Sequence, residues 1–190
     1  MDLPELTTLV DIAIRDCEQI IKQNPLAVLS EGDLEKLLSE CISRRIGYVA
    51  ERPTPNSFAV YTQISHYDNV KDEKDAEVDI LLMKPEKIEI TVDKGKRFIY
   101  KSKESIAIEL KYRHDDDRGC VTAAKNDIDK FVKYKDDSYY YSIILLDKNE
   151  NTKTHEKEIL DYYETKKTLM GRDYDNKFFC VVLVKETANK

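Results

Sequence analysis

Ile106-Ala107-Ile108-Glu109-Leu110-Lys111-Tyr112 is an apolar, strand-forming run that contains one acidic and one basic residue. Successive side chains of a strand point to opposite faces, so Glu109 and Lys111 share a face with the small Ala107, and the large apolar side chains share the other face. Burying a charged group is costly unless a partner compensates it. We therefore expect Glu109 and Lys111 to have a chemical role.

A second apolar run with an acid precedes the first, Val78-Asp79-Ile80-Leu81-Leu82. If the two predicted strands are neighbours in a sheet, Asp79 and Glu109 can converge on one cation. Magnesium takes oxygen ligands and keeps several waters, so two carboxylates and a backbone carbonyl, which we assign to Leu110, would suffice. The ion would lower the pKa of a bound water, and Lys111 would position that water or offset charge on the phosphorus. These residue types predict a magnesium-dependent phosphodiesterase.

Composition narrows the class of protein. A chain of 190 residues is long enough for one domain with a core, and its net charge of -6 means that nucleic-acid binding needs a local basic patch or a metal. No signal peptide is evident, and no apolar run approaches the roughly 20 residues of a membrane span, so we expect a soluble cytoplasmic protein that does not bind membranes. The cysteines are too widely spaced for a zinc ribbon or a redox motif and are predicted to be reduced thiols. They are Cys17, Cys41, Cys120 and Cys180.

Apolar periodicity, turn residues and caps predict a succession of helices and strands. The predicted helices cover residues 4–23, 31–46, 121–134 and 154–170. The predicted strands cover residues 58–65, 76–83, 88–92, 97–100, 106–112, 139–146 and 178–184. Helices that join the late strands imply parallel pairing there. We predict a single α/β domain over residues 1–190, with a mixed central sheet flanked by helices on both sides.

The order of these pieces resembles the PD-(D/E)XK nuclease superfamily, the restriction-endonuclease-like proteins. The similarity covers residues 30–150: an acidic helix start, a strand with Asp79, a strand with Glu109 and Lys111, then a helix and a strand. It implies divalent-metal nuclease chemistry, with Mg²⁺ or Mn²⁺ held by Asp79 and Glu109 and with Lys111 as the catalytic lysine. The helix acid is Glu31 or Glu35, and we favour Glu31 because it begins the helix after Ser30.

Around this motif-bearing core, we expect residues 1–29 to form a helix that packs on the core and residues 151–190 to form a closing helix and strand. The predicted hairpin at residues 88–100 is an insertion between the two acidic strands.

Basic residues gather in the hairpin segment 87–103, which has six Lys or Arg against two acids. We predict that this hairpin contacts a nucleic-acid backbone, DNA more than RNA, although a charged hairpin that only aids solubility is the alternative. The predicted nucleic-acid-binding residues are Lys94, Lys96, Arg97, Arg113 and Lys125, and for Lys125 the alternative is an ordinary surface lysine.

The sequence also fits other interpretations. A catalytically silent nuclease-fold module would bind nucleic acid or a protein partner, and in an unrelated α/β domain Glu109 and Lys111 would be a structural pair. The amino-terminal helix packs on the core or forms a homodimer. The tyrosines at 139–141 fit amphipathic packing better than base stacking. The chain lacks the motifs of phosphate loops, dinucleotide-binding turns, serine hydrolases and zincins.

Overall fold

A computed structural model describes residues 1–49, 57–66, 76–93, 97–102, 104–114, 116–133, 138–170 and 176–186. Its strands join in one seven-stranded sheet in the order β3-β4-β1-β2-β5-β6-β7. The strands are β1 (Ala59–His66), β2 (Ala76–Met83), β3 (Glu89–Asp93), β4 (Arg97–Lys101), β5 (Ser105–Tyr112), β6 (Tyr139–Asp147) and β7 (Phe178–Lys185). The sheet is mixed, because β2 pairs antiparallel with β1 and β5, whereas β5, β6 and β7 are parallel.

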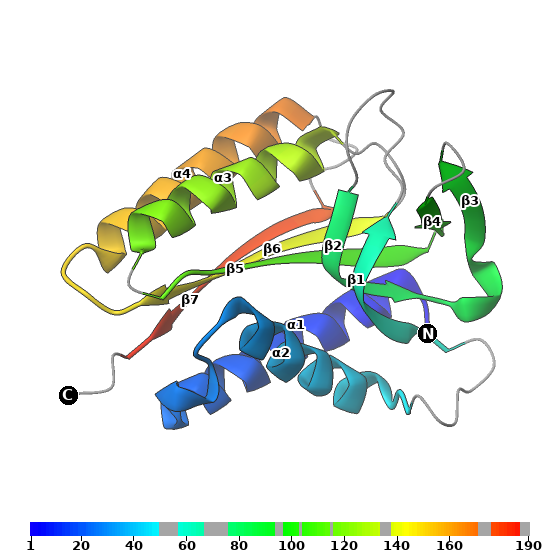
Figure 1. Cartoon of the computed structure of the whole chain (residues 1–190), viewed down its shortest axis with the longest axis horizontal. Helices are drawn as coiled ribbons and strands as arrows, with labels where there is room; N and C mark the ends of the chain where they lie inside the picture. Colours follow the sequence, from blue (N-terminus) through cyan, green and yellow to red (C-terminus); the bar gives the residue numbers. More distant parts are fainter. Residues whose placement is uncertain are drawn as a thin grey trace.

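Two pairs of helices cover the two faces of this sheet (Figure 1). One pair is α1 (Leu3–Gln23) and α2 (Glu31–Ile46), and the other is α3 (Asp117–Lys133) and α4 (Thr152–Met170). Each pair buries its own apolar cluster against the sheet. The prediction of a mixed sheet with helices on both sides is confirmed, and β5, which lies between β2 and β6, contacts α2 on one face and α3 on the other.

Local sequence signals explain where the amino-terminal helices begin and end. Asp2 caps α1 by accepting the Glu5 N–H at 2.9 Å, and Ser30 caps α2 by accepting the Asp33 N–H at 3.2 Å. Gly47 ends α2 with φ of 68°, a left-handed conformation that glycine adopts without a steric penalty. The predicted limits of α2 are therefore confirmed.

The third helix starts earlier than expected. We predicted a start at Val121, where the apolar stripe begins, but α3 starts at Asp117. Asp116 explains the extra turn, because its carboxylate accepts the Gly119 N–H at 3.0 Å and so caps the helix. Arg118 and Gly119 carry no large apolar side chain, so the apolar pattern did not mark the first turn of this helix.

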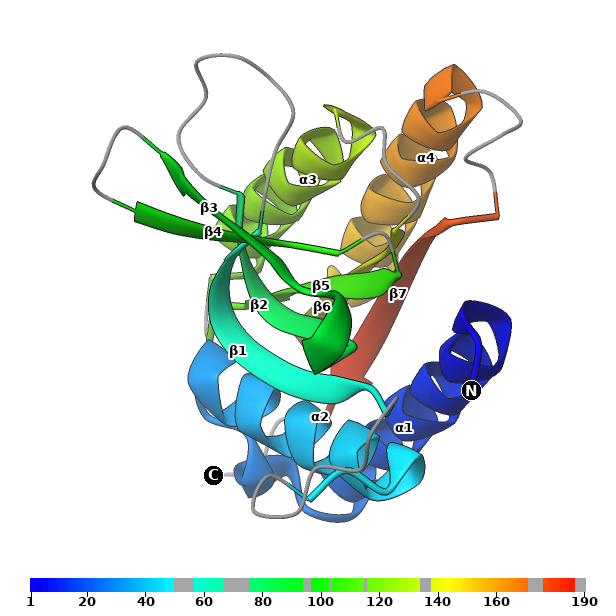
Figure 2. The ribbon, with the colours of Figure 1, turned by 90° about the vertical axis from the view of Figure 1, so that its right-hand side faces the viewer.

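The predicted hairpin insertion forms the edge of the sheet, where β4 pairs with β1 and β3 pairs with β4 (Figure 2). Its turn, residues 94–96, lies outside the described residues. Short 3₁₀ turns at Pro25–Ala27 and Pro85–Lys87 complete the described elements. Among the helices that the structure describes, none has the length and apolar character to cross a bilayer.

The predicted thiols and tyrosines are largely packed inside. The four cysteines are free, and three of them are buried. Tyr140 and Tyr141 are buried, and Tyr139 stacks on Phe179 with ring centroids 6.3 Å apart. Packing, the interpretation that we favoured over base stacking, accounts for these side chains.

Candidate active site

The register of three strands aligns the two predicted metal ligands. Ile80 pairs with Thr62 of β1 and with Ile108 of β5, and the antiparallel ladder with β5 ends at this pair. One residue beyond this pair, Asp79 of β2 corresponds in register to Glu109 of β5, but the two strands no longer pair there. The two acids therefore lie just past the end of the ladder, where the acidic strands separate.

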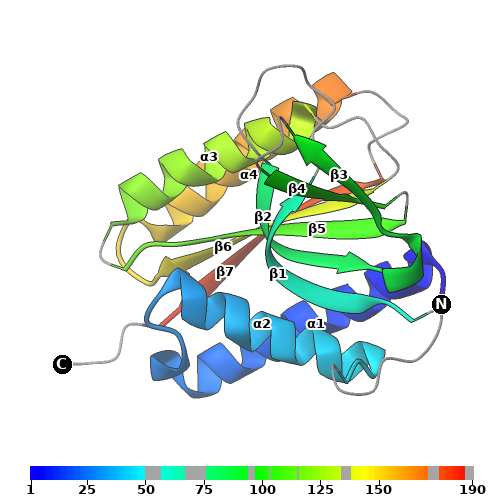
Figure 3. The same ribbon diagram turned by 45° about the vertical axis from the view of Figure 1, so that its right-hand side comes forward.

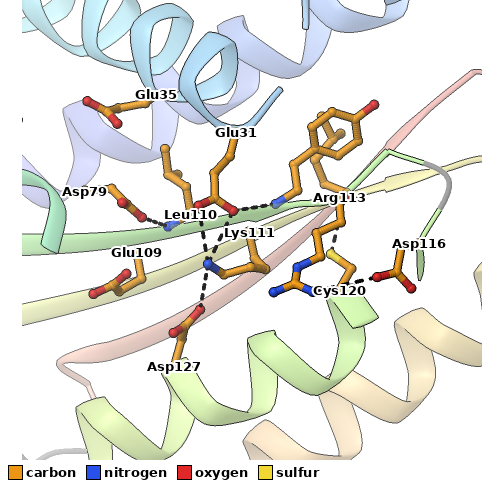
Figure 4. A network of polar contacts seen from close by, with 12 residues as sticks. Glu31, Glu35, Asp79, Glu109, Leu110, Lys111, Arg113, Asp116, Cys120 and Asp127 are labelled. Atoms are coloured by element: carbon orange, nitrogen blue, oxygen red, sulfur yellow. Dashed lines mark hydrogen bonds and ion pairs between the residues drawn. The ribbon is translucent and has the colours of Figure 1, made fainter. Parts of the chain in front are cut away.

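Asp79 fills the gap between the strands with its own side chain. Its Oδ2 accepts the backbone N–H of Leu110 at 2.7 Å (Figure 4). The carboxylate thus takes the place of a strand carbonyl. Its other oxygen, Oδ1, accepts from Gln63 Nε2 at 3.3 Å. Asp79 is therefore held by backbone and side-chain donors at the point where the sheet opens.

Gln63 has a backbone conformation that is uncommon for a residue with a side chain. Its φ is 52°, and it occupies the position of β1 opposite Asp79. The same amide nitrogen that reaches Asp79 also donates to Glu35 Oε2 at 2.6 Å. Residues held in this region of backbone space are enriched at functional sites. Gln63 links β1, β2 and α2, and sequence reasoning did not select it because a backbone angle has no signature in the residue type.

Glu109 is deeply buried, with a side chain only 6% exposed. It lies on the face of β5 that packs against α3, and its Oε1 contacts the ammonium of Lys130. Burial raises the pKa of Glu109 to about 8; Lys130 opposes part of this rise, and Asp79 and Asp127 add to it. A carboxylate in this position favours a positive partner.

Lys111 lies two residues further along β5, between the two helix layers. Its Nζ is 3.3 Å from Glu31 Oε2 on α2 and 3.6 Å from Asp127 Oδ2 on α3 (Figure 4). Burial lowers the pKa of Lys111, but the carboxylates of Asp127 and Glu31 outweigh this and hold it above its ordinary value. The ammonium therefore stays charged and is oriented from both sides of the sheet.

The two candidate helix acids have different partners. Glu31 Oε2 accepts the backbone N–H of Tyr112 at 3.1 Å, beside its contact with Lys111. Glu35, one turn further along α2, reaches the site through Gln63. Figure 4 shows Glu31 pointing from α2 to the strand that carries Leu110 and Lys111, whereas Glu35 does not point to these two residues. Glu31 thus contacts the predicted catalytic lysine, and Glu35 supports Asp79 indirectly.

Two residues of α3 belong to the site and were missed by sequence reasoning, Asp127 and Lys130. They are spaced three apart, so they share a helix face, and α3 lies against β5 on the side opposite α2 (Figure 3). Within the described part of the chain, Asp127 Oδ2 is buried and accepts no hydrogen bond. Burial raises the pKa of Asp127 to about 6, against the lowering effect of Lys111. The only sequence feature that could have indicated Asp127 is its position next to the apolar stripe of the predicted helix.

Of the predicted nucleic-acid-binding residues, the structure describes the side chains of Arg113 and Lys125, and each of these lies beside an acidic residue. Arg113 is exposed and lies 3.7 Å from Asp116, and Lys125 pairs with Glu158 of α4 at 2.7 Å. Lys125 also lies 5.2 Å from the centre of the Tyr162 ring, so it joins the two helices of its layer. Lys94 and Lys96 lie outside the described residues, and the backbone of Arg97 begins β4.

A groove lies beside the site, between α2 and β1. It encloses about 490 Å³ and is lined by hydroxyl and charged groups. Its lining residues are Gly32, Glu35, Lys36, Ser39, Glu40, Ser43, Arg44 and Thr62. Glu35 lines the groove and accepts a hydrogen bond from Gln63, which also donates to Asp79, so two contacts connect the groove to Asp79.

The chemistry of the donor set fits a hard cation. Magnesium is commonly held by one or two carboxylates, with water and substrate oxygens as its other ligands. Asp79 and Glu109 supply two carboxylates, and the raised pKa of Glu109 indicates a demand for positive charge. No group of three or more His, Cys, Asp or Glu arranged for a metal occurs among the residues that the structure describes. A fully protein-lined metal cage is thus not present there, whereas a two-carboxylate site is compatible with the geometry.

Comparison of the chain with protein-family models, curated proteins and solved structures finds no significant match.

Proposed function

We propose that this chain is a divalent-metal-dependent nuclease with a restriction-endonuclease-like fold, which hydrolyses phosphodiester bonds, those of DNA in particular. One observation carries the proposal. Asp79 and Glu109 occupy corresponding positions where β2 and β5 stop pairing, and Lys111 follows two residues after Glu109 on β5, with its ammonium between the two helix layers. Two acids and an amine at the open end of a strand pair are the groups that phosphodiester hydrolysis needs.

Asp79 and Glu109 would hold Mg²⁺ or Mn²⁺, together with the carbonyl oxygen of Leu110. When bound, the ion supplies a Lewis acid for a phosphate oxygen and lowers the pKa of a bound water. The hydrogen bond from the Leu110 N–H fixes Asp79 before any ligand arrives. Gln63 limits the rotation of the same carboxylate through its contact with Oδ1.

Lys111 would orient the attacking water or stabilise the negative charge that grows on the phosphate. Glu31 and Asp127 hold its ammonium from opposite helix layers, so the amine does not need to be ordered during the reaction. Glu31 is in turn fixed by the Tyr112 N–H. In this proposal Glu31 and Asp127 position Lys111 and do not contact the substrate.

The test is metal-dependent cleavage of plasmid DNA, single-stranded DNA and RNA by the full chain. Glu109→Gln keeps the shape of the side chain but removes its charge, and we expect it to lower cleavage at least about 100-fold, the scale of losing a key electrostatic group. Glu158→Gln is the matched control, because Glu158 pairs with Lys125 and Arg118 away from the site. Equal cleavage by the wild type and Glu109→Gln would refute the proposed nuclease.

A specific observation favours a second candidate, a catalytically silent module that binds nucleic acid or a protein. Glu109 and Lys111 each have an ion partner in the structure, so both charges are already compensated within the fold. A silent module would bind DNA without cutting it, and its affinity would not change in Glu109→Gln. Filter binding next to the cleavage assay separates the two functions.

A further inference from the structure

Lys130 of α3 lies directly against a proposed metal ligand. Its Nζ contacts Glu109 Oε1 and also the backbone carbonyl oxygen of Glu77. These two oxygens come from β5 and β2, the strands that carry the predicted metal ligands. Carboxylate and carbonyl oxygens are the donors that a hard divalent cation takes. The ammonium therefore lies where positive charge is expected in the metal-bound protein.

We propose that Lys130 is a resident cation that competes with the divalent ion for Glu109 and leaves this carboxylate when the ion binds. The inference rests on the proposed function, because it takes Glu109 as a metal ligand. The inference assigns Lys130 of α3 to the site and predicts that this lysine weakens metal binding.

Burial and charge support this exchange. The Lys130 side chain is 25% exposed and the Glu109 side chain is 6% exposed, so the flexible lysine can turn to solvent while the carboxylate stays in place. Asp79 and Asp127 place further negative charge around Glu109. Without a divalent ion, this group of acids needs a counter-ion, and Lys130 provides one.

The direction of the effect follows from thermodynamics. Contact between Lys130 and Glu109 stabilises only the metal-free protein, because an ammonium beside a bound divalent cation is repelled. A group that stabilises only the free state lowers the affinity for the ligand. Removing the lysine charge therefore tightens metal binding.

Lys111 does not share this role. Its ammonium contacts Glu31 and Asp127 and belongs to the proposed reaction, whereas Lys130 contacts the ligand Glu109 itself. The two amines approach the site from β5 and from α3, and they can be tested separately.

The experiment is a calorimetric titration of the full chain with Mn²⁺ at pH 8. The variants are Lys130→Met, which keeps most of the apolar stem, and Lys130→Gln, which keeps a hydrogen-bond donor for the Glu77 carbonyl. Lys125→Met is the matched control, because Lys125 lies on the same helix but pairs with Glu158. We expect about tenfold tighter binding in both Lys130 variants, and no change in Lys125→Met. Circular dichroism establishes that each variant is folded.

The outcomes separate this inference from the proposed function. Tighter binding in the Lys130 variants, or binding that appears only in them, supports the inference. Wild-type binding that is lost in Glu109→Gln but is unchanged or weaker in the Lys130 variants overturns the inference and leaves the nuclease proposal standing. Binding that persists in Glu109→Gln, or is absent from the wild type and the Lys130 variants alike, overturns both.

Discussion

Glu109→Gln is expected to change how stability depends on pH. Burial raises the pKa of Glu109 from 4.5 to about 8 in the metal-free protein. The folded state then binds more protons than the unfolded state between these values, so the stability that this group contributes is complete below pH 4.5 and is lost as the pH rises through 8. Glutamine has the same shape and does not titrate.

The size of the effect follows from the pKa shift. The linkage between proton binding and folding predicts that, from pH 5 to pH 8, the free energy of unfolding of the wild type falls by roughly 3 kcal/mol relative to that of Glu109→Gln. For a chain of this length, this amounts to about 10 °C in the melting temperature. Groups far from the site titrate equally in both proteins, so the difference between them reports Glu109 and the acids coupled to it, Asp79 and Asp127.

The assay is thermal or urea unfolding of both proteins in chelator, at several pH values between pH 5 and pH 8. The free energy of unfolding of Glu109→Gln should increase steadily relative to that of the wild type as the pH rises. Manganese at 100 times its Kd should then add about 2.7 kcal/mol to the free energy of unfolding of the wild type, and nothing to that of Glu109→Gln. A stability difference that stays flat over this range would refute the reasoning, since it would mean that Lys130 fully compensates the buried charge.

Three further substitutions test separate parts of the structure. Lys111→Met should abolish cleavage yet keep Mn²⁺ binding, and loss of both in calorimetry would contradict its proposed role. Asp79→Ala removes the acceptor of the Leu110 N–H and should cost about 1–3 kcal/mol in urea unfolding, whereas Asp79→Asn keeps an acceptor and should cost less. Gly47→Ala should cost about 1 kcal/mol, because its φ of 68° disfavours a side chain although the space around it is open; an unchanged midpoint would argue against the left-handed cap.

The buried central strands were predictable because their pattern is local. The limits of β2 agree with the predicted 76–83, since alternating and continuous apolar residues mark a strand wherever it lies in the sheet. Ser30 and Gly47 likewise marked α2, because a cap acts on its own helix. The predicted start of α3 was wrong by one turn, because Arg118 and Gly119 carry no large apolar side chain.

The site was predictable only in part. Asp79, Glu109 and Lys111 stood out because charges are unusual in apolar strands, and the structure places Asp79 against the backbone of Leu110, between Glu109 and Lys111 on β5. Their catalytic and metal-binding roles remain predictions. Nothing in the residues around Lys125 indicated its partner Glu158, which lies on a different helix.

The amino-acid sequence by itself determined the elements, their order and the charged positions of the two central strands, because apolar periodicity and capping act over a few neighbouring residues. Only the tertiary structure decided that Asp127 and Lys130 of α3 face Lys111 and Glu109, and that Gln63 adopts a left-handed backbone opposite Asp79. These contacts join residues far apart in the chain, and they form only when the sheet opens between β2 and β5 with a helix layer packed on each face.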